Sequence, residues 1–196
     1  MQRRELLRFA GVSLAAVLID YPLALAAARE SAEPLVLNRD EWYGLEAVCA
    51  RILPPVNGVS VADAGCVNFI DKLLAHEEQA LAPGYRVALG ALTRQGGGRQ
   101  AFAASAAARQ DELLAMLEDG ILQGWPTDGL AQPEFFGLLR WHTLLGFLAD
   151  PRYGGNRNGV GWHAIGHAGH LHAHGGVSDE QLAGLAEGAV GNLPER

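Results

Sequence analysis

The chain has 196 residues and is acidic, with 22 Asp and Glu against 15 Lys and Arg and a formal net charge of -7. Nucleic acid is excluded as a partner, because phosphate contacts need clustered basic side chains and Lys72 is the single lysine in the sequence. There is also no basic amphipathic stripe of the kind that holds proteins on a membrane surface, so we expect any membrane association to be indirect.

The amino terminus predicts an export leader over residues 1–28. Arg3 and Arg4 stand directly before an apolar run, residues 9–19, that is short for a membrane span. Paired arginines in this position resemble the twin-arginine signal, an address for proteins that are exported after folding. We therefore expect a periplasmic protein with a cleaved leader. The alternative is an uncleaved amino-terminal anchor.

The first helix of the remaining chain carries one of two cysteines. Asn38 with Glu41 three positions later has the pattern of a capping box, and apolar residues follow at helical spacing until Pro54. Cys49 lies on this helix and Cys66 on the next. An exported protein can oxidise such a pair to a disulfide, and the alternatives are buried free thiols or a bridge between subunits. Two cysteines are too few for an iron–sulfur cluster.

Three further helices follow. We expect the second from about Asp63 and ending before Pro83, the third around Leu89, and the fourth to close at Gly120. The glycine run over residues 96–98 separates the third from the fourth.

The fold class predicted from these patterns is all-α, a single domain over residues 29–196 with five to six helices. Pro133 is placed to open a fifth helix over residues 134–149, and a short terminal helix is expected over residues 179–189. No strand is followed by a glycine-rich phosphate loop, and no Cys-x-x-Cys-His run is present. The chain is therefore expected to bind neither a dinucleotide nor covalent haem, and we identify no catalytic residues.

A glycine-rich segment, residues 150–162, comes directly after the fifth helix. Asp150-Pro151 disfavours continuation of the helix, and the glycines allow tight turns or close approach of another backbone. One interpretation is a long loop that binds a partner. The other is a structural turn held by its own side chains.

With Gly146-Phe147-Leu148 before it and Trp162-His163-Ala164-Ile165-Gly166 after it, this segment resembles the gluconate 2-dehydrogenase subunit 3 family. The resemblance implies a non-catalytic small subunit that matures, escorts and stabilises a large FAD-containing dehydrogenase subunit, with a multihaem cytochrome c as a further member of the complex. It also implies that the segment packs against the large subunit. The residues expected to do so are Asp150, Pro151, Arg152, Tyr153, Gly154, Gly155, Asn156, Arg157 and Trp162.

A histidine tract directly after this segment supports a different function, that of a free periplasmic metal-binding protein. Clustered imidazoles can coordinate zinc, copper or nickel if the backbone brings them together. Histidine-rich tracts are also common as surface segments with incidental metal affinity. The candidate ligands are His163, His167, His170, His172 and His174.

Overall fold

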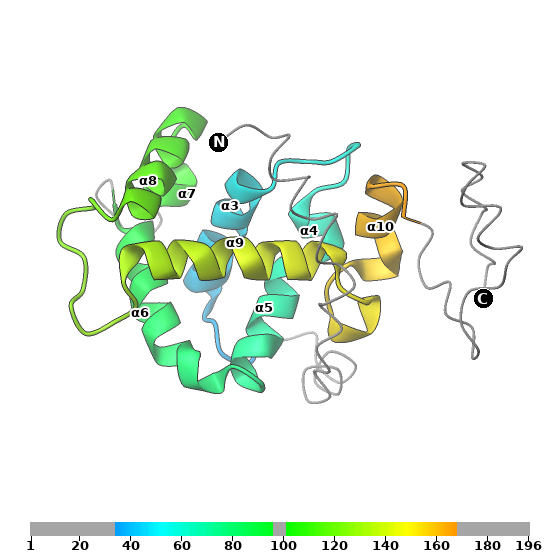
Figure 1. Ribbon diagram of the computed structural model, residues 1–196, viewed down its shortest axis with the longest axis horizontal. Helices are drawn as coiled ribbons and strands as arrows, with labels where there is room; N and C mark the ends of the chain where they lie inside the picture. Colours follow the sequence, from blue (N-terminus) through cyan, green and yellow to red (C-terminus); the bar gives the residue numbers. More distant parts are fainter. Residues whose placement is uncertain (1–33, 96–100, 168–196) are drawn as a thin grey trace, which may run out of the picture.

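The computed structural model describes residues 34–95 and 101–167. These residues form an all-α fold, as predicted (Figure 1). The β-type pairing among them is an isolated bridge between Val56 and Val59. The predicted leader with Arg3 and Arg4, the glycine run over residues 96–98 and the terminal helix over residues 179–189 lie outside the described residues.

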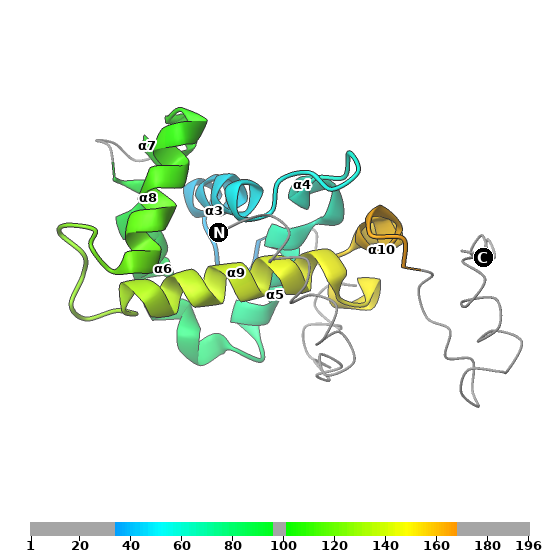
Figure 2. The ribbon, with the colours of Figure 1, turned by 45° about the horizontal axis from the view of Figure 1, so that its top comes forward.

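The longest helix, α9 (Gln132–Leu148), runs along the molecule and crosses α3 (Arg39–Ile52) and α5 (Cys66–Ala75) (Figures 1 and 2). It packs most extensively against α5 and α8, so it links the two ends of the domain. The other elements are α4 (Val61–Ala64), α6 (Ala82–Thr93), α7 (Ala101–Ala104), α8 (Ala107–Asp119), α10 (Val160–Ala164) and three 3-10 turns, η2 (Gln79–Leu81), η3 (Pro151–Tyr153) and η4 (Arg157–Gly159).

The helix signals read from the sequence are confirmed at three helix ends. The Asn38 side chain accepts a hydrogen bond from the Glu41 amide at 3.0 Å, and the Glu41 carboxylate accepts one from the Asn38 amide at 2.8 Å. Gly120 ends α8 in the left-handed conformation, with φ 75°. Pro133 lies in the first turn of α9, where its missing N–H costs no intrahelical bond.

The second predicted helix is wrong in its bounds, because the structure divides it. Gly65 adopts φ 71°, so α4 ends there and α5 begins in a new direction. A second capping box, between Ser60 and Asp63, starts α4. The helix α5 ends at Ala75, before Pro83 as predicted, and Pro83 lies in the first turn of α6.

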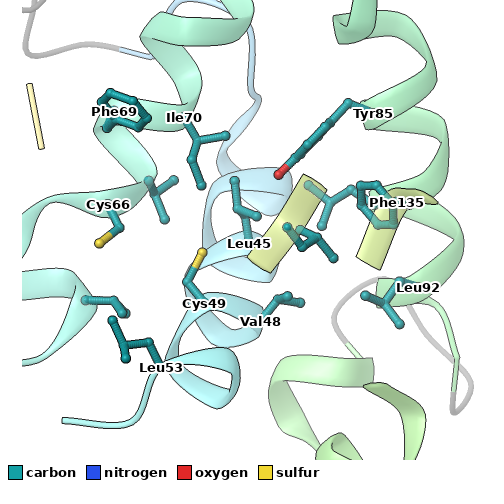
Figure 3. Packing of buried hydrophobic residues seen from close by; sticks show 14 of the residues in the cluster. Leu45, Val48, Cys49, Leu53, Cys66, Phe69, Ile70, Tyr85, Leu92 and Phe135 are labelled. Atoms are coloured by element: carbon teal, nitrogen blue, oxygen red, sulfur yellow. The ribbon is translucent and has the colours of Figure 1, made fainter. Parts of the chain in front are cut away.

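The core lies between α9 and the helices that it crosses, and Figure 3 shows part of it. Each buried Leu or Phe side chain stabilises the fold by about 1.5–3 kcal/mol relative to its exposed state. The largest fully buried apolar side chains are Tyr85, Phe69, Phe102, Phe135, Phe147, Leu45, Ile70, Leu73, Leu74, Leu89 and Leu92.

Cys49 and Cys66 are both buried free thiols, which is one of the three alternatives that the sequence left open. Their sulfur atoms point in different directions, as Figure 3 shows. The Cys49 sulfur instead accepts a hydrogen bond from the Thr143 hydroxyl of α9 at 3.2 Å. Burial raises the pKa of the Cys49 thiol to about 12 and also raises that of Cys66, so neither forms the reactive thiolate at neutral pH.

A buried ion pair on α5 holds the segment that leads into the first helix. The Asp71 carboxylate accepts hydrogen bonds from the backbone N–H groups of Leu35, Val36 and Leu37 at 2.7, 3.0 and 2.9 Å. It also lies 3.2 Å from the Lys72 ammonium, and both charged side chains are fully buried. Three amides and a cation together compensate the cost of burying this carboxylate.

Within the described residues, no helix has both the length and the apolar character that a membrane crossing requires.

Candidate functional site

The glycine-rich segment is not an open loop. The turns η3 and η4 and the start of α10 occupy most of it. The Asp150 carboxylate begins η3 by accepting the Arg152 amide at 2.9 Å. Left-handed residues then reverse the chain, at Gly154 (φ 91°), Asn156 (φ 43°) and Asn158 (φ 54°). The segment therefore has a defined folded shape.

Asn156 is the centre of this fold and is fully buried. Its backbone N–H donates to the Gly146 carbonyl at 2.7 Å, and its side-chain amide donates to the Ala149 carbonyl at 2.9 Å. Its side-chain oxygen accepts the Gly161 N–H at 2.8 Å. The resemblance implied that Asn156 packs against the large subunit, but its side-chain amide is hydrogen-bonded within the chain.

Trp162 also closes the end of α9. Its indole N–H donates to the Leu148 carbonyl at 2.7 Å, and 9% of the residue is exposed. The last carbonyls of a helix have no intrahelical partner. Asn156 and Trp162 supply such partners for α9, so the glycine-rich segment acts as its carboxyl-terminal cap.

Three glycines are required by contacts between backbones. A Cβ on Gly146 would lie 2.9 Å from the Cys66 Cα, where α9 crosses the start of α5. A Cβ on Gly155 would collide with the Gly146 carbonyl, and one on Gly161 would collide with the Phe147 carbonyl. The chain therefore uses these glycines for close backbone packing within the domain.

Side chains from elsewhere fasten the segment to the domain. The Asn68 side-chain amide of α5 donates to the Gly154 carbonyl at 2.8 Å, and that of Asn57 donates to the Ala164 carbonyl at 2.8 Å. The Arg157 side chain lies across Gly65, where a Cβ would be 2.5 Å from the guanidinium Nε. These contacts attach the segment to the rest of the domain.

The outward side of the segment is basic and polar. Arg152, Arg157 and Asn158 are exposed, whereas Tyr153, Gly155 and Trp162 are buried. The Arg152 Nε lies 3.0 Å from the Asp150 carboxylate, and its guanidinium lies 5.6 Å from the centre of the Tyr153 ring. Asp150, Pro151 and Gly154 are half-buried. Of the nine residues predicted to contact a partner, only the two arginines present exposed side chains.

His163 and His167 are exposed, and His170, His172 and His174 lie outside the described residues. The His167 ring makes an edge contact with Trp162, with centroids 5.6 Å apart. In the part of the chain that the structure covers, no three His, Cys, Asp or Glu residues are grouped to hold a metal ion.

The sequence pattern of the family described as gluconate 2-dehydrogenase subunit 3 matches residues 39–169. The chain belongs to this family. Subunit 3 proteins are non-catalytic accessory subunits of a dehydrogenase complex, and the match includes every helix named above and the whole glycine-rich segment. Comparison with curated proteins and with solved structures gives no match.

This subunit 3 chain also contains a buried polar contact that sequence reasoning missed. His142 on α9 is fully buried, and its Nε2 lies 2.9 Å from a carboxylate oxygen of Glu78. Its ring stacks on Tyr85, with centroids 5.8 Å apart. Burial raises the pKa of the Tyr85 hydroxyl well above its ordinary value. His142 is thus a packed histidine, and the signal in the sequence was its position on the apolar side of α9.

Proposed function

We propose that this chain is the small subunit that matures, stabilises and escorts a periplasmic, flavin-dependent dehydrogenase of the gluconate- or sugar-oxidising type. The family match over residues 39–169 carries this proposal. FAD belongs on the large subunit, because the sequence has no phosphate-binding loop that follows a strand. A multihaem cytochrome c is the expected electron acceptor in the complex.

The exposed side of the glycine-rich segment supports a binding function. Arg152 and Arg157 are of the residue type enriched at the energetic centres of interfaces, because guanidinium groups pair with carboxylates in two-point geometry. The Asp150 and Tyr153 contacts restrain the Arg152 side chain, and Gly65 leaves space for that of Arg157. Restraint before binding lowers the entropy lost on association. The two arginines therefore form a prepared contact for acidic side chains of the large subunit.

The amino terminus supplies the export function of this proposal. Arg3 and Arg4 would direct the chain, together with the flavoprotein bound to it, to the pathway that exports folded proteins. A large subunit without a leader of its own would then depend on this chain to reach the periplasm.

The binding test is affinity purification of the tagged protein from its native periplasm and membranes, with identification of partners by mass spectrometry and a flavin absorbance spectrum. A stoichiometric yellow dehydrogenase subunit is the expected result. Replacing Arg152 and Arg157 with Ala should reduce its recovery, whereas Arg109→Ala, at an exposed arginine of α8, should not. Recovery of a colourless monomer that carries stoichiometric metal would overturn the proposal in favour of the histidine tract.

The export test replaces Arg3 and Arg4 with Lys, which keeps the charge. The expected result is that both this chain and the dehydrogenase subunit remain in the cytoplasm, as measured by fractionation and immunoblotting. Unchanged periplasmic dehydrogenase in this variant would contradict the escort role and leave the binding role intact.

A further inference from the structure

The connection between α3 and α4 contains an Asn-Gly pair at the tip of a tight turn. The backbones of Val56 and Val59 exchange two hydrogen bonds, each 3.0 Å long. Asn57 and Gly58 lie between them with left-handed backbones, φ 48° and 85°, as the central residues of a type I′ turn require. Both residues are exposed. Figures 1 and 2 show this connection reaching out beside α10.

An asparagine that precedes glycine can lose its side-chain amide without an enzyme. The backbone nitrogen of the glycine gives up its proton and attacks the side-chain carbonyl carbon of the asparagine. The new C–N bond closes a succinimide ring, while the bond to the amide nitrogen breaks and that nitrogen leaves with the proton as ammonia. Water then opens the ring to aspartate or isoaspartate. Glycine favours the attack because it has no Cβ and leaves the backbone free to move.

The sequence has two Asn-Gly pairs, and their attacking nitrogens differ. Within the described residues the Gly58 N–H has no hydrogen-bond partner, and a Cβ on Gly58 would meet no atom within 4 Å. The Gly159 N–H instead donates to the Asn156 carbonyl at 2.8 Å, and Gly159 is buried. Asn158 is itself exposed, so exposure of the asparagine does not distinguish the pairs. The glycine nitrogen is available for attack only in the turn.

The Asn57 side chain also holds the end of the glycine-rich segment. Its Nδ2 donates to the Ala164 carbonyl at 2.8 Å. Ala164 is the last residue of α10 and is buried. Deamidation removes the donor, and the carboxylate that replaces it can only accept hydrogen bonds, so two oxygen atoms would face each other. A carbonyl left without its donor is unfavourable, and the end of α10 should therefore separate from the turn.

We propose that Asn57 is a site of spontaneous deamidation, and that the reaction releases the end of α10 from the turn between α3 and α4. The bond to Ala164 slows the reaction without preventing it, because one hydrogen bond at the surface opens by local fluctuation. The attack at Gly159 requires a larger opening, in which the turn η4 unfolds. Since the amide is lost irreversibly, this attachment of the glycine-rich segment weakens with the age of the protein.

The reaction is measured by keeping the purified chain at pH 8 and following both Asn-Gly peptides by mass spectrometry. In the folded chain, Asn57 should be lost at least about tenfold faster than Asn158, because the Gly159 amide must first be freed. In urea the two rates should agree within about twofold, since the fold no longer protects either site. Equal rates in the folded chain, or faster loss of Asn158, would overturn the assignment of the site.

The release of α10 is measured by hydrogen exchange at the Ile165 and Gly166 amides, which are bonded at the end of α10. Asn57→Asp reproduces the aspartate product and should raise both exchange rates at least about tenfold. Asn57→Gly, which removes the donor without adding charge and suits a left-handed backbone, should do the same. Asn158→Asp, with the same charge change at an exposed left-handed position, is the matched control and should leave them within about twofold. Unchanged exchange in both Asn57 variants would overturn the release.

Discussion

The two sides of α9 differ in what explains their glycines. At Gly146 the helix lies directly against α5, and Gly155 of the glycine-rich segment lies against Gly146 in turn, so a side chain at either position would collide with backbone atoms. At Gly137 no neighbour is close enough to require glycine. A glycine that the chain needs for its own packing and one that it does not need can thus lie on the same helix. The second kind can be replaced without a collision inside the described fold.

The strongest test of the packed side is to add a methyl group where backbones meet. Gly155→Ala and Gly161→Ala should each lower the free energy of unfolding by about 3 kcal/mol or more. The new methyl groups would collide with backbone carbonyls, which cannot move aside as a flexible side chain can. Urea unfolding followed by circular dichroism measures this loss. Unchanged midpoints would show that the backbone can relax and that these glycines are not required.

The capping function of Asn156 gives the next largest effect. Asn156→Ala leaves the buried Gly161 N–H and the Ala149 carbonyl without their bonds, at a left-handed backbone position. Asn158→Ala is the matched control, because Asn158 is also left-handed, with φ 54°, but is exposed. The unfolding free energy should fall by about 2 kcal/mol more for Asn156→Ala than for the control. Equal losses would assign the whole effect to backbone strain.

The buried thiol of Cys49 predicts how the free energy of unfolding depends on pH. The pKa of Cys49 is raised from 9.0 to about 12 by burial, so above pH 9 the unfolded state releases its proton while the folded state keeps it. The contribution of the Cys49 thiol to the free energy of unfolding is therefore complete below pH 9. It falls by about 1.4 kcal/mol per pH unit as the pH rises from 9 toward 12. Comparison of wild type with Cys49→Ala by urea unfolding isolates this slope.

Accessibility of the same thiols tests the absence of a disulfide. At pH 8 a thiol reagent should label both cysteines only after denaturation, and a reducing agent should leave the Tm unchanged. A Tm lowered by the reductant would instead support the bridge that the sequence suggested between Cys49 and Cys66.

A side chain at the open position of Gly137 on α9 should increase stability. Gly137→Ala should raise the free energy of unfolding of the isolated chain by about 1 kcal/mol, because alanine loses less backbone entropy in a helix and meets no atom there. Thermal unfolding of the isolated chain measures the gain. A loss would mean that the space around Gly137 is filled within this chain, and the contrast with Gly146 would then disappear.

The smallest effect is expected at the exposed arginines. Arg152→Ala removes a surface ion pair with Asp150 and should change the unfolding free energy by no more than about 0.5 kcal/mol. The same variant separates binding from folding, because a reduced recovery of the dehydrogenase subunit would then not result from unfolding. A loss near 2 kcal/mol would place Arg152 among the residues that hold the segment together.

Local signals predicted much of this fold. The capping box at Asn38, the proline in the first turn of α9 and Gly120 after α8 act within one helical turn, so sequence neighbours are sufficient to identify them. The division at Gly65 was missed because the apolar spacing continues across it. Its left-handed backbone is accompanied by the Arg157 side chain, which comes from a distant part of the chain.

The candidate site was less predictable because its contacts are long-range. The sequence identified the glycine-rich segment as unusual, but not that Gly155 lies on Gly146 or that Asn68 holds Gly154. The Asp71–Lys72 pair could have been predicted from the sequence, because two adjacent opposite charges inside an apolar run indicate a buried ion pair.

Asp71 sets a limit on how far the chain can be shortened from its amino end. Its carboxylate holds the N–H groups of Leu35, Val36 and Leu37, so a protein that begins beyond these residues leaves a buried carboxylate with Lys72 alone.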